Sequence, residues 1–198
     1  YAHYSRFKTV TRYGIRYALD LRESVDRGIF LLGWEPHTLN WLNAHLKSGD
    51  TVIEVGANVG AHSLTISSLV GSSGCLYAFE PTNYAFSKLN KNFQLNPIFL
   101  KNTKLLQLFV SDKQNSESTS KIRSSWIVNK SDQLADEMDE TFSGSVINLD
   151  NFFVDLERLD LLKIDVDGFD YRVLQGSKRL ISSLKPVVFV ELGENDLQ

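Results

Sequence analysis

The chain has 198 residues, with 21 basic and 24 acidic side chains and a net charge of −3. This length fits one domain with a short appendage, and ordinary hydrophobic and charged fractions exclude a disordered, collagen-like or long coiled-coil protein. The acidic balance disfavours nucleic-acid binding, and the absence of an apolar run of ~20 residues disfavours membrane insertion. The single cysteine, Cys75, cannot form an internal disulfide, which predicts a cytoplasmic location.

The N-terminal residues predict an extension to a larger domain. Residues 7–21 alternate β-branched and aromatic with polar side chains around a central glycine, a pattern typical of a β-hairpin outside the main fold. Thr38 is expected to cap a helix that ends at Gly49. We therefore expect a hairpin and helix extension at residues 1–48 and the main domain at residues 49–198.

The main domain alternates short apolar runs with helical patterns. Because such runs are typical of parallel strands covered by helices on both faces, the sequence predicts a doubly wound, mainly parallel α/β fold. Ligands of such folds bind at the carboxyl ends of the strands. The five expected strands are residues 51–55, 75–79, 105–110, 161–164 and 187–190.

Residues 113–144 interrupt this alternation. The segment is rich in Ser, Asn, Lys, Asp and Glu and is too long for an ordinary connection. It is either a solvated insertion or a lid over a site, and a short strand is expected around residues 125–128.

A glycine-containing loop follows the first strand. Residues 54–60 read Glu-Val-Gly-Ala-Asn-Val-Gly; Gly56 permits a sharp turn and close approach to a ligand, and amides at the start of the following helix favour an anion. A dinucleotide-binding loop also needs glycine at the positions of Asn58 and Ala61, so that pattern fails at two of three places. S-adenosylmethionine has no pyrophosphate, and the loop therefore favours S-adenosylmethionine over NAD.

Acidic residues follow four of the five expected strands. Glu80 comes after the second strand, where a carboxylate can accept hydrogen bonds from both ribose hydroxyls or simply stabilise a helix start. Asp112 follows the third strand and either meets an adenine amino group or forms a turn. Asp165 and Glu191 follow the fourth and fifth strands. Charges placed directly after apolar runs need partners or a ligand.

Taken in order, these motifs resemble the FkbM family of S-adenosylmethionine-dependent methyltransferases. The resemblance covers most of the chain beyond residue 33. The motifs that carry it are Gly-Trp-Glu at 33–35, Ile-Glu-Val-Gly-Ala-Asn-Val-Gly at 53–60, Tyr-Ala-Phe-Glu-Pro at 77–81, Val-Ser-Asp at 110–112 and Asp-Leu-Leu-Lys-Ile-Asp-Val-Asp-Gly at 160–168.

The resemblance implies a Rossmann-like class I methyltransferase fold and methylation of a hydroxyl on a sugar or natural-product acceptor. It also implies that Asp165 lies beside the transferred methyl group. Class I sheets normally finish with an antiparallel hairpin, which is not reached by Gln198, so we expect either a fragment or a sheet completed in another way. The expected cofactor-binding residues are Glu54, Gly56, Ala57, Asn58, Gly60, Glu80, Pro81, Ser111, Asp112 and Asp165.

The candidate proton acceptors are Asp165, Glu191 and His62. Asp165 and Glu191 could instead hold a divalent cation, but no third ligand is evident and we expect no metal. The expected partner is a small-molecule or glycan acceptor, with no nucleic acid and no membrane, and Trp34 and Trp126 are candidate stacking surfaces for it. Two alternatives remain at this point: an NAD-dependent oxidoreductase and a non-catalytic S-adenosylmethionine-binding domain.

Overall fold

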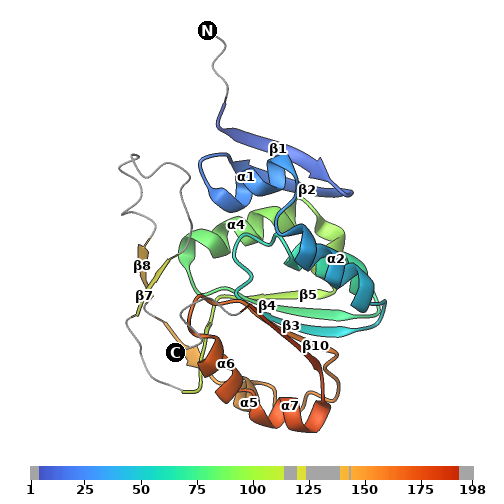
Figure 1. The fold of residues 1–198 in the computed structure, drawn as a ribbon, viewed down its shortest axis with the longest axis vertical. Coiled ribbons are helices and arrows are strands. Elements are labelled where there is room, and N and C mark those ends of the chain that lie inside the picture. Colours follow the sequence, from blue (N-terminus) through green and yellow to red (C-terminus); the bar gives the residue numbers. More distant parts are fainter. Residues whose placement is uncertain (1–4, 114–119, 124–138, 143, 192–198) are drawn as a thin grey trace.

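The fold is built on a five-stranded parallel sheet. The computed structural model describes residues 5–113, 120–123, 139–142 and 144–191. The strands stand in the order β11-β10-β3-β4-β5, and every neighbouring pair is parallel (Figure 1). This confirms the predicted doubly wound α/β architecture. The strand bounds are Thr51–Val55 (β3), Cys75–Phe79 (β4), Thr103–Leu106 (β5), Leu161–Ile164 (β10) and Val187–Val190 (β11).

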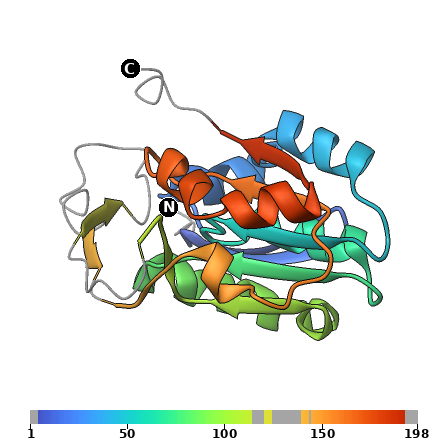
Figure 2. The same ribbon diagram turned by 90° about the horizontal axis from the view of Figure 1, so that it is seen from below.

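Helices cover both faces of the sheet, as Figures 1 and 2 show. Successive strand side chains point to opposite faces, so Val52 belongs to one apolar core and Ile53 to the other. The first core takes side chains from α2 (Pro36–His45), α3 (Ser63–Val70) and α4 (Asn83–Gln94), which is followed by a 3₁₀ turn at Pro97–Lys101. The second core takes them from α5 (Leu149–Phe152), α6 (Asp170–Gln175) and α7 (Lys178–Leu184).

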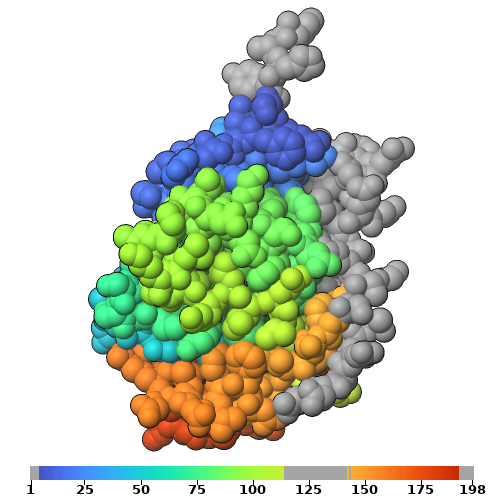
Figure 3. Space-filling view, turned by 180° about the vertical axis from the view of Figure 1, so that it is seen from behind, coloured from blue at the N-terminus to red at the C-terminus, as the bar shows by residue number. Residues whose placement is uncertain are grey.

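The N-terminal residues form the predicted hairpin, β1 (Phe7–Arg12) and β2 (Ile15–Asp20), followed by a helix, α1 (Ser24–Leu31). Figure 3 shows this segment in blue, lying directly against the green region that contains α4. Buried side chains of β2 and α1 belong to the same apolar core as α3 and α4. The extension therefore shares its core with the sheet, and the boundary between residues 48 and 49 stays a prediction.

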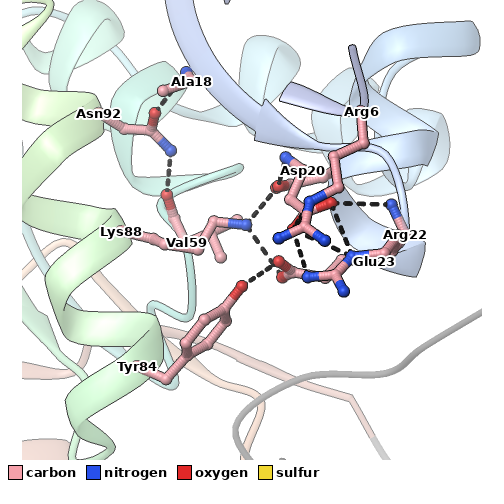
Figure 4. Close-up of polar contacts among 10 residues, drawn as sticks. Arg6, Ala18, Asp20, Arg22, Glu23, Val59, Tyr84, Lys88 and Asn92 are labelled. Carbon is pink, nitrogen blue, oxygen red and sulfur yellow. Dashed lines mark hydrogen bonds and ion pairs between the residues drawn. The ribbon is translucent and has the colours of Figure 1, made fainter. Parts of the chain in front are cut away.

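Asn92 on α4 joins the hairpin to the loop after β3 (Figure 4). Its Oδ1 accepts a hydrogen bond from the backbone amide of Ala18 at 2.8 Å, and its Nδ2 donates to the carbonyl oxygen of Val59 at 2.8 Å. The Asn92 side chain is fully buried. Buried amides of this kind cost free energy when left unpaired, so this contact fixes the loop against the extension.

A second set of polar contacts ties α1 to α4 (Figure 4). The ammonium group of Lys88 pairs with the carboxylates of Glu23, at 2.9 Å, and Asp26. The hydroxyl of Tyr84 donates to Glu23 as well. Because both carboxylates are buried, the cation between them offsets a charge burial that would otherwise be costly.

The expected strand at 105–110 is wrong, because it is two separate strands. β5 ends at Leu106, and β6 (Phe109–Val110) pairs with β9 (Val146–Ile147) in a sheet of its own. The amide of Ser111 continues that pairing by donating to the carbonyl oxygen of Ile147 at 2.8 Å. Backbone groups leave one sheet only where another partner satisfies them, and β9 provides it.

The predicted start of the second helix is also wrong. α2 begins at Pro36 with Glu35 at the N-cap, and Thr38 lies inside the first turn with its hydroxyl donating to the Glu35 carboxylate at 3.3 Å. Proline is favoured at the first helical position because its missing N–H needs no partner there. The helix ends at His45, before Gly49. α1 is not among the helices predicted from the sequence, and its pattern is interrupted by Gly28.

Part of the 113–144 segment forms an antiparallel pair of strands, β7 (Ser120–Arg123) and β8 (Asp139–Phe142). The strand expected at residues 125–128, with Trp126, lies outside the described residues. Within the described part of the chain, no helix combines the length and the apolar character needed to cross a bilayer.

Candidate functional site

A cavity of about 530 Å³ opens at the carboxyl edge of the sheet, within the range of about 300–1,000 Å³ that is usual for ligand pockets. It lies where β3, β4, β10 and β11 end, which is the position expected for a ligand in a doubly wound fold. Among the described residues, its lining comprises Ser24, Val25, Trp34, Glu35, Val55, Gly56, Ala57, Asn58, Ala61, His62, Phe79, Glu80, Pro81, Leu108, Phe109, Val110, Asp165, Val166, Asp167, Phe169 and Glu191.

Gly56 is required by the backbone of the loop after β3. Its φ is +92°, and a Cβ built on it would stand 1.8 Å from the carbonyl oxygen of Asp165. No larger residue fits this position without moving the end of β10. Gly60 also has a positive φ, +88°, but its Cβ would meet Leu89 in the core rather than the cavity.

The loop amides are occupied by the protein itself. The N–H groups of Gly56 and Ala57 both donate to the carbonyl oxygen of Phe79 at 2.9 Å, and the N–H of Asn58 donates to the Glu80 carboxylate at 2.9 Å. α3 begins only at Ser63. These three amides are therefore not available to an anion. The expected anion site concerned the amides at the start of the following helix, and it stays a prediction.

Glu80 is fixed at the cavity wall by hydrogen bonds to both of its carboxylate oxygens. Oε2 accepts from the amide of Asn58, and Oε1 accepts from the amide of Thr82 at 2.9 Å and from its hydroxyl at 2.6 Å. The residue is only 6% exposed. Glu80 thus lies beside the Gly56 loop, as predicted, and also makes the helix-start contacts that were the alternative interpretation.

Asn58 presents a buried oxygen that lacks a partner. Its backbone is left-handed, with φ 48°, and its Oδ1 makes no hydrogen bond to any described residue. A buried acceptor without a donor costs free energy, and Asn58 borders the cavity. A ligand that donates a hydroxyl or amino hydrogen would satisfy it.

Lys163 forms ion pairs with two carboxylates near the cavity, those of Asp165 and Glu54. The side chain is fully buried, and its Nζ lies 3.0 Å from Asp165 Oδ2 and 3.6 Å from Glu54 Oε1. Burial alone would lower the pKa of Lys163, but the charges of Asp165 and Glu54 raise it above the usual value. Glu54 also accepts the Ser63 hydroxyl at 2.5 Å. Glu54 therefore contacts the ammonium group of Lys163 without bordering the cavity itself.

Glu35, His62 and Asp165 meet on one side of the cavity. One ligand-type atom from each lies within 4.8 Å of the others, and Glu35 Oε2 is 3.6 Å from His62 Nε2. Burial, and then the charge of Lys163, lower the pKa of His62 well below its usual value. Burial and the charge of Asp165 raise the pKa of Glu35. Burial, together with the charges of Asp165 and Glu35, raises the pKa of Glu191 to about 7.

Most of the predicted site residues border the cavity, but four do not. Ser111 is buried and donates its hydroxyl to the carboxylate of Asp112, which is exposed after β6. The residues that border it are Gly56, Ala57, Asn58, His62, Glu80, Pro81, Asp165 and Glu191. The residues placed elsewhere are Glu54, Gly60, Ser111 and Asp112.

Several parts of the cavity wall are not among the predicted site residues, including Glu35 and the start of α1. Glu35 belongs to the Gly-Trp-Glu motif at residues 33–35, and this motif is the sequence signal for it. Ser24 and Val25 at the start of α1 had no such signal, because only the docking of α1 on α4 brings them to the cavity.

The fold is similar to that of a solved methyltransferase. A SAM-dependent O-methyltransferase from Thermotoga maritima superposes with a TM-score of 0.50 and 15% identity, over 96% of this chain and 58% of that chain. M. jannaschii TYW2, solved in complex with AdoMet, has a TM-score of 0.41 and 16% identity over 54% of this chain and 45% of that chain. At 15% identity, the likeness to the Thermotoga maritima enzyme concerns the fold alone.

Comparisons of the sequence give the family. Methyltransferase sdnD of Sordaria araneosa is 28% identical over 163 residues, which cover 67% of this chain and 62% of that protein. The chain thus spans less than two thirds of this relative's length. The model of the methyltransferase FkbM domain matches residues 54–197. The chain belongs to the FkbM methyltransferase family.

Proposed function

We propose that the chain is an S-adenosylmethionine-dependent methyltransferase that methylates a hydroxyl group of a sugar or natural-product acceptor. The observation that carries the proposal is the contact between the Glu80 carboxylate and the Gly56–Asn58 loop at one wall of the cavity. In a member of the FkbM family, this wall has the two features that a nucleoside with an amino-acid tail needs: an acceptor for ribose hydroxyls and a tight backbone bend.

Different cavity residues bind different parts of the cofactor. In our proposal Glu80 accepts the ribose hydroxyls and the unpaired Oδ1 of Asn58 accepts a further hydrogen of the ligand. The apolar wall formed by Phe79, Leu108 and Phe109 suits the flat adenine ring. Glu54, Gly60, Ser111 and Asp112 act indirectly, by shaping the loop and the strands behind this wall.

The chain's chemical task is to position the acceptor and remove its proton. When bound, S-adenosylmethionine would supply a methyl group carried on a positively charged sulfur; the sulfur would keep the electron pair of the broken bond, and the acceptor oxygen would bond to the methyl carbon. Holding the two groups in line supplies about 7–11 kcal/mol of the barrier in favourable cases. Asp165, Glu191 and His62 border the cavity as candidates to take the hydroxyl proton, a step worth roughly 10²–10⁴-fold.

The charge of the cavity favours a neutral acceptor. Five carboxylates line it, those of Glu35, Glu80, Asp165, Asp167 and Glu191, and they would repel the phosphates of a nucleic acid. Trp34 also lines the cavity, and in our proposal its ring stacks on a sugar. We propose a small-molecule or glycan acceptor and, on the basis of the single free cysteine, a cytoplasmic location.

Two measurements test the proposal. Calorimetric titration of the chain with S-adenosylhomocysteine and with NAD should give binding of the first and none of the second; the opposite result would favour an oxidoreductase. Transfer of labelled methyl from S-adenosylmethionine to a panel of sugar and polyketide hydroxyls should then be detected. Binding without transfer to any acceptor would favour the non-catalytic binding domain.

A further inference from the structure

We propose that Glu35, His62 and Asp165 form a site for a divalent transition cation, Mn²⁺ or Zn²⁺, on the wall of the cavity. One carboxylate oxygen from each acid and one ring nitrogen lie within 4.8 Å of one another. Ligands on opposite sides of such an ion, each bonded at about 2.0–2.2 Å, stand roughly 4 Å apart. The three side chains are therefore already grouped closely enough for small adjustments to close them around one ion.

The buried nitrogen of His62 is the independent observation that points to a ligand. The residue is 5% exposed, and its Nε2 has no hydrogen-bond partner among the residues that the structure describes. Glu35 Oε2, at 3.6 Å, is beyond hydrogen-bond distance. A buried polar atom without a partner is costly, and an ion held between Glu35 and Asp165 would satisfy it.

The charged groups around this nitrogen carry a net negative charge, which favours a cation. Glu35 and Asp165 are carboxylates, and Glu191 and Asp167 line the same cavity. Lys163 brings one positive charge, but its ammonium group already lies between Asp165 and Glu54. A divalent ion on the cavity side of Asp165 would balance the remaining negative charge.

The donor set decides which cations fit. One imidazole and two carboxylates suit first-row transition ions, whereas Mg²⁺ prefers oxygen ligands alone. Three protein ligands also leave coordination positions open, which is typical of catalytic rather than structural sites. The proposal departs from the sequence-based expectation of no metal, because that expectation considered only Asp165 and Glu191.

The role of the ion follows from its position and rests on the proposed function. A cation between Glu35, His62 and Asp165 would bind the acceptor hydroxyl and lower its pKa, as metal ions do for bound water. His62 and Asp165 would then be occupied as ligands. Glu191, at the end of β11 on the same cavity, would be left to take the proton.

Metal binding is tested on the whole chain without any cofactor. After treatment with EDTA and dialysis, the protein is titrated by calorimetry with MnCl₂ or ZnCl₂ alone. We expect one metal site in the wild type and a metal affinity about 10–100-fold lower in Glu35→Gln. Glu157→Gln is the matched control, because it makes the same chemical change at an exposed position and should bind as the wild type does. Absence of binding, or equal binding by Glu35→Gln, would overturn the proposal.

Nuclear magnetic resonance of ¹⁵N-labelled histidines locates the ion without any variant. The chain has four histidines, and Zn²⁺ should shift the ring nitrogens of His62 while leaving those of His37 and His45 unchanged. Zn²⁺ binding that leaves the His62 signals in place would contradict the proposal even if Glu35→Gln fails to fold. Binding of S-adenosylhomocysteine to the EDTA-treated protein is measured separately, so that loss of the proposed function and loss of the metal site are distinguished.

Discussion

The carboxylate of Glu80 accepts a hydrogen bond from the backbone amide of Asn58 at 2.9 Å. This bond joins the end of β4 to the loop that follows β3, two strands that are neighbours in the sheet. The same loop is held from the other side by Asn92, which binds the carbonyl oxygen of Val59. The proposed cofactor wall is therefore preorganised by the protein before any ligand is bound.

Replacing Gly56 by alanine should destabilise the protein. The new Cβ would stand 1.8 Å from the Asp165 carbonyl oxygen at a φ of +92°, so it adds about 1–3 kcal/mol of overpacking to a left-handed backbone cost of about 1–2 kcal/mol. Urea unfolding measures the difference. Gly14→Ala is the control, since Gly14 has a φ of +79° with nothing within 4 Å of its Cβ and should lose only the backbone cost. Equal losses at the two positions would mean that the close approach to Asp165 is absent.

Asn92→Ala should weaken both the fold and the site. It removes the partner of the Ala18 amide and of the Val59 carbonyl, and each buried group left unpaired costs about 1–3 kcal/mol. Because Val59 lies in the loop, S-adenosylhomocysteine should also bind less tightly. Asn90→Ala on the same helix removes only a contact with the carbonyl of Phe86 and serves as the control. Unfolding free energies and calorimetric affinities that are the same for both variants would contradict this link.

Asp26 should make stability depend on pH. Burial raises the pKa of Asp26 from 3.8 to about 6, although Lys88 acts in the opposite direction. A carboxyl group whose pKa is raised on folding stabilises the folded state while it holds its proton, and this contribution is lost as the pH rises through about 6.

The test is urea unfolding of the wild type and Asp26→Asn from pH 4 to pH 7. The free energy of unfolding of Asp26→Asn relative to the wild type should increase with pH up to about 6, by at most roughly 1.4 kcal/mol for each pH unit. Asp155→Asn, at an exposed position, should show a constant difference. A constant difference for Asp26→Asn as well would show that its carboxyl group has an ordinary pKa.

The sheet and its carboxyl edge could be predicted because the responsible signals are local. Apolar runs of four or five residues mark β3, β4, β10 and β11, and parallel topology then brings Gly56, Glu80, Asp165 and Glu191 to one edge. The family could be predicted for the same reason, since its motifs lie where these strands end.

The errors arise where tertiary partners decide the structure. Residues 105–110 have the pattern of one apolar strand, but Phe109 and Val110 pair with β9 in another sheet. Asp112 consequently lies away from the cavity. Glu35 could not be placed beside His62 and Asp165 from spacing alone, because α2 and β10 are far apart in the sequence. The contribution of α1 to the cavity depends in the same way on the buried contacts of Lys88.

The central claim is that Glu80 binds the nucleoside of the methyl donor, and calorimetric titration with S-adenosylhomocysteine tests it most directly. Wild-type protein should bind, and Glu80→Ala should bind about 10–100-fold more weakly, since hydrogen bonds to a charged group contribute about 1.5–3 kcal/mol. Glu157→Ala, an exposed glutamate, should retain the wild-type affinity, and circular dichroism should show that all three proteins are folded. Unchanged affinity in a folded Glu80→Ala protein, or no binding by the wild type, would contradict the claim.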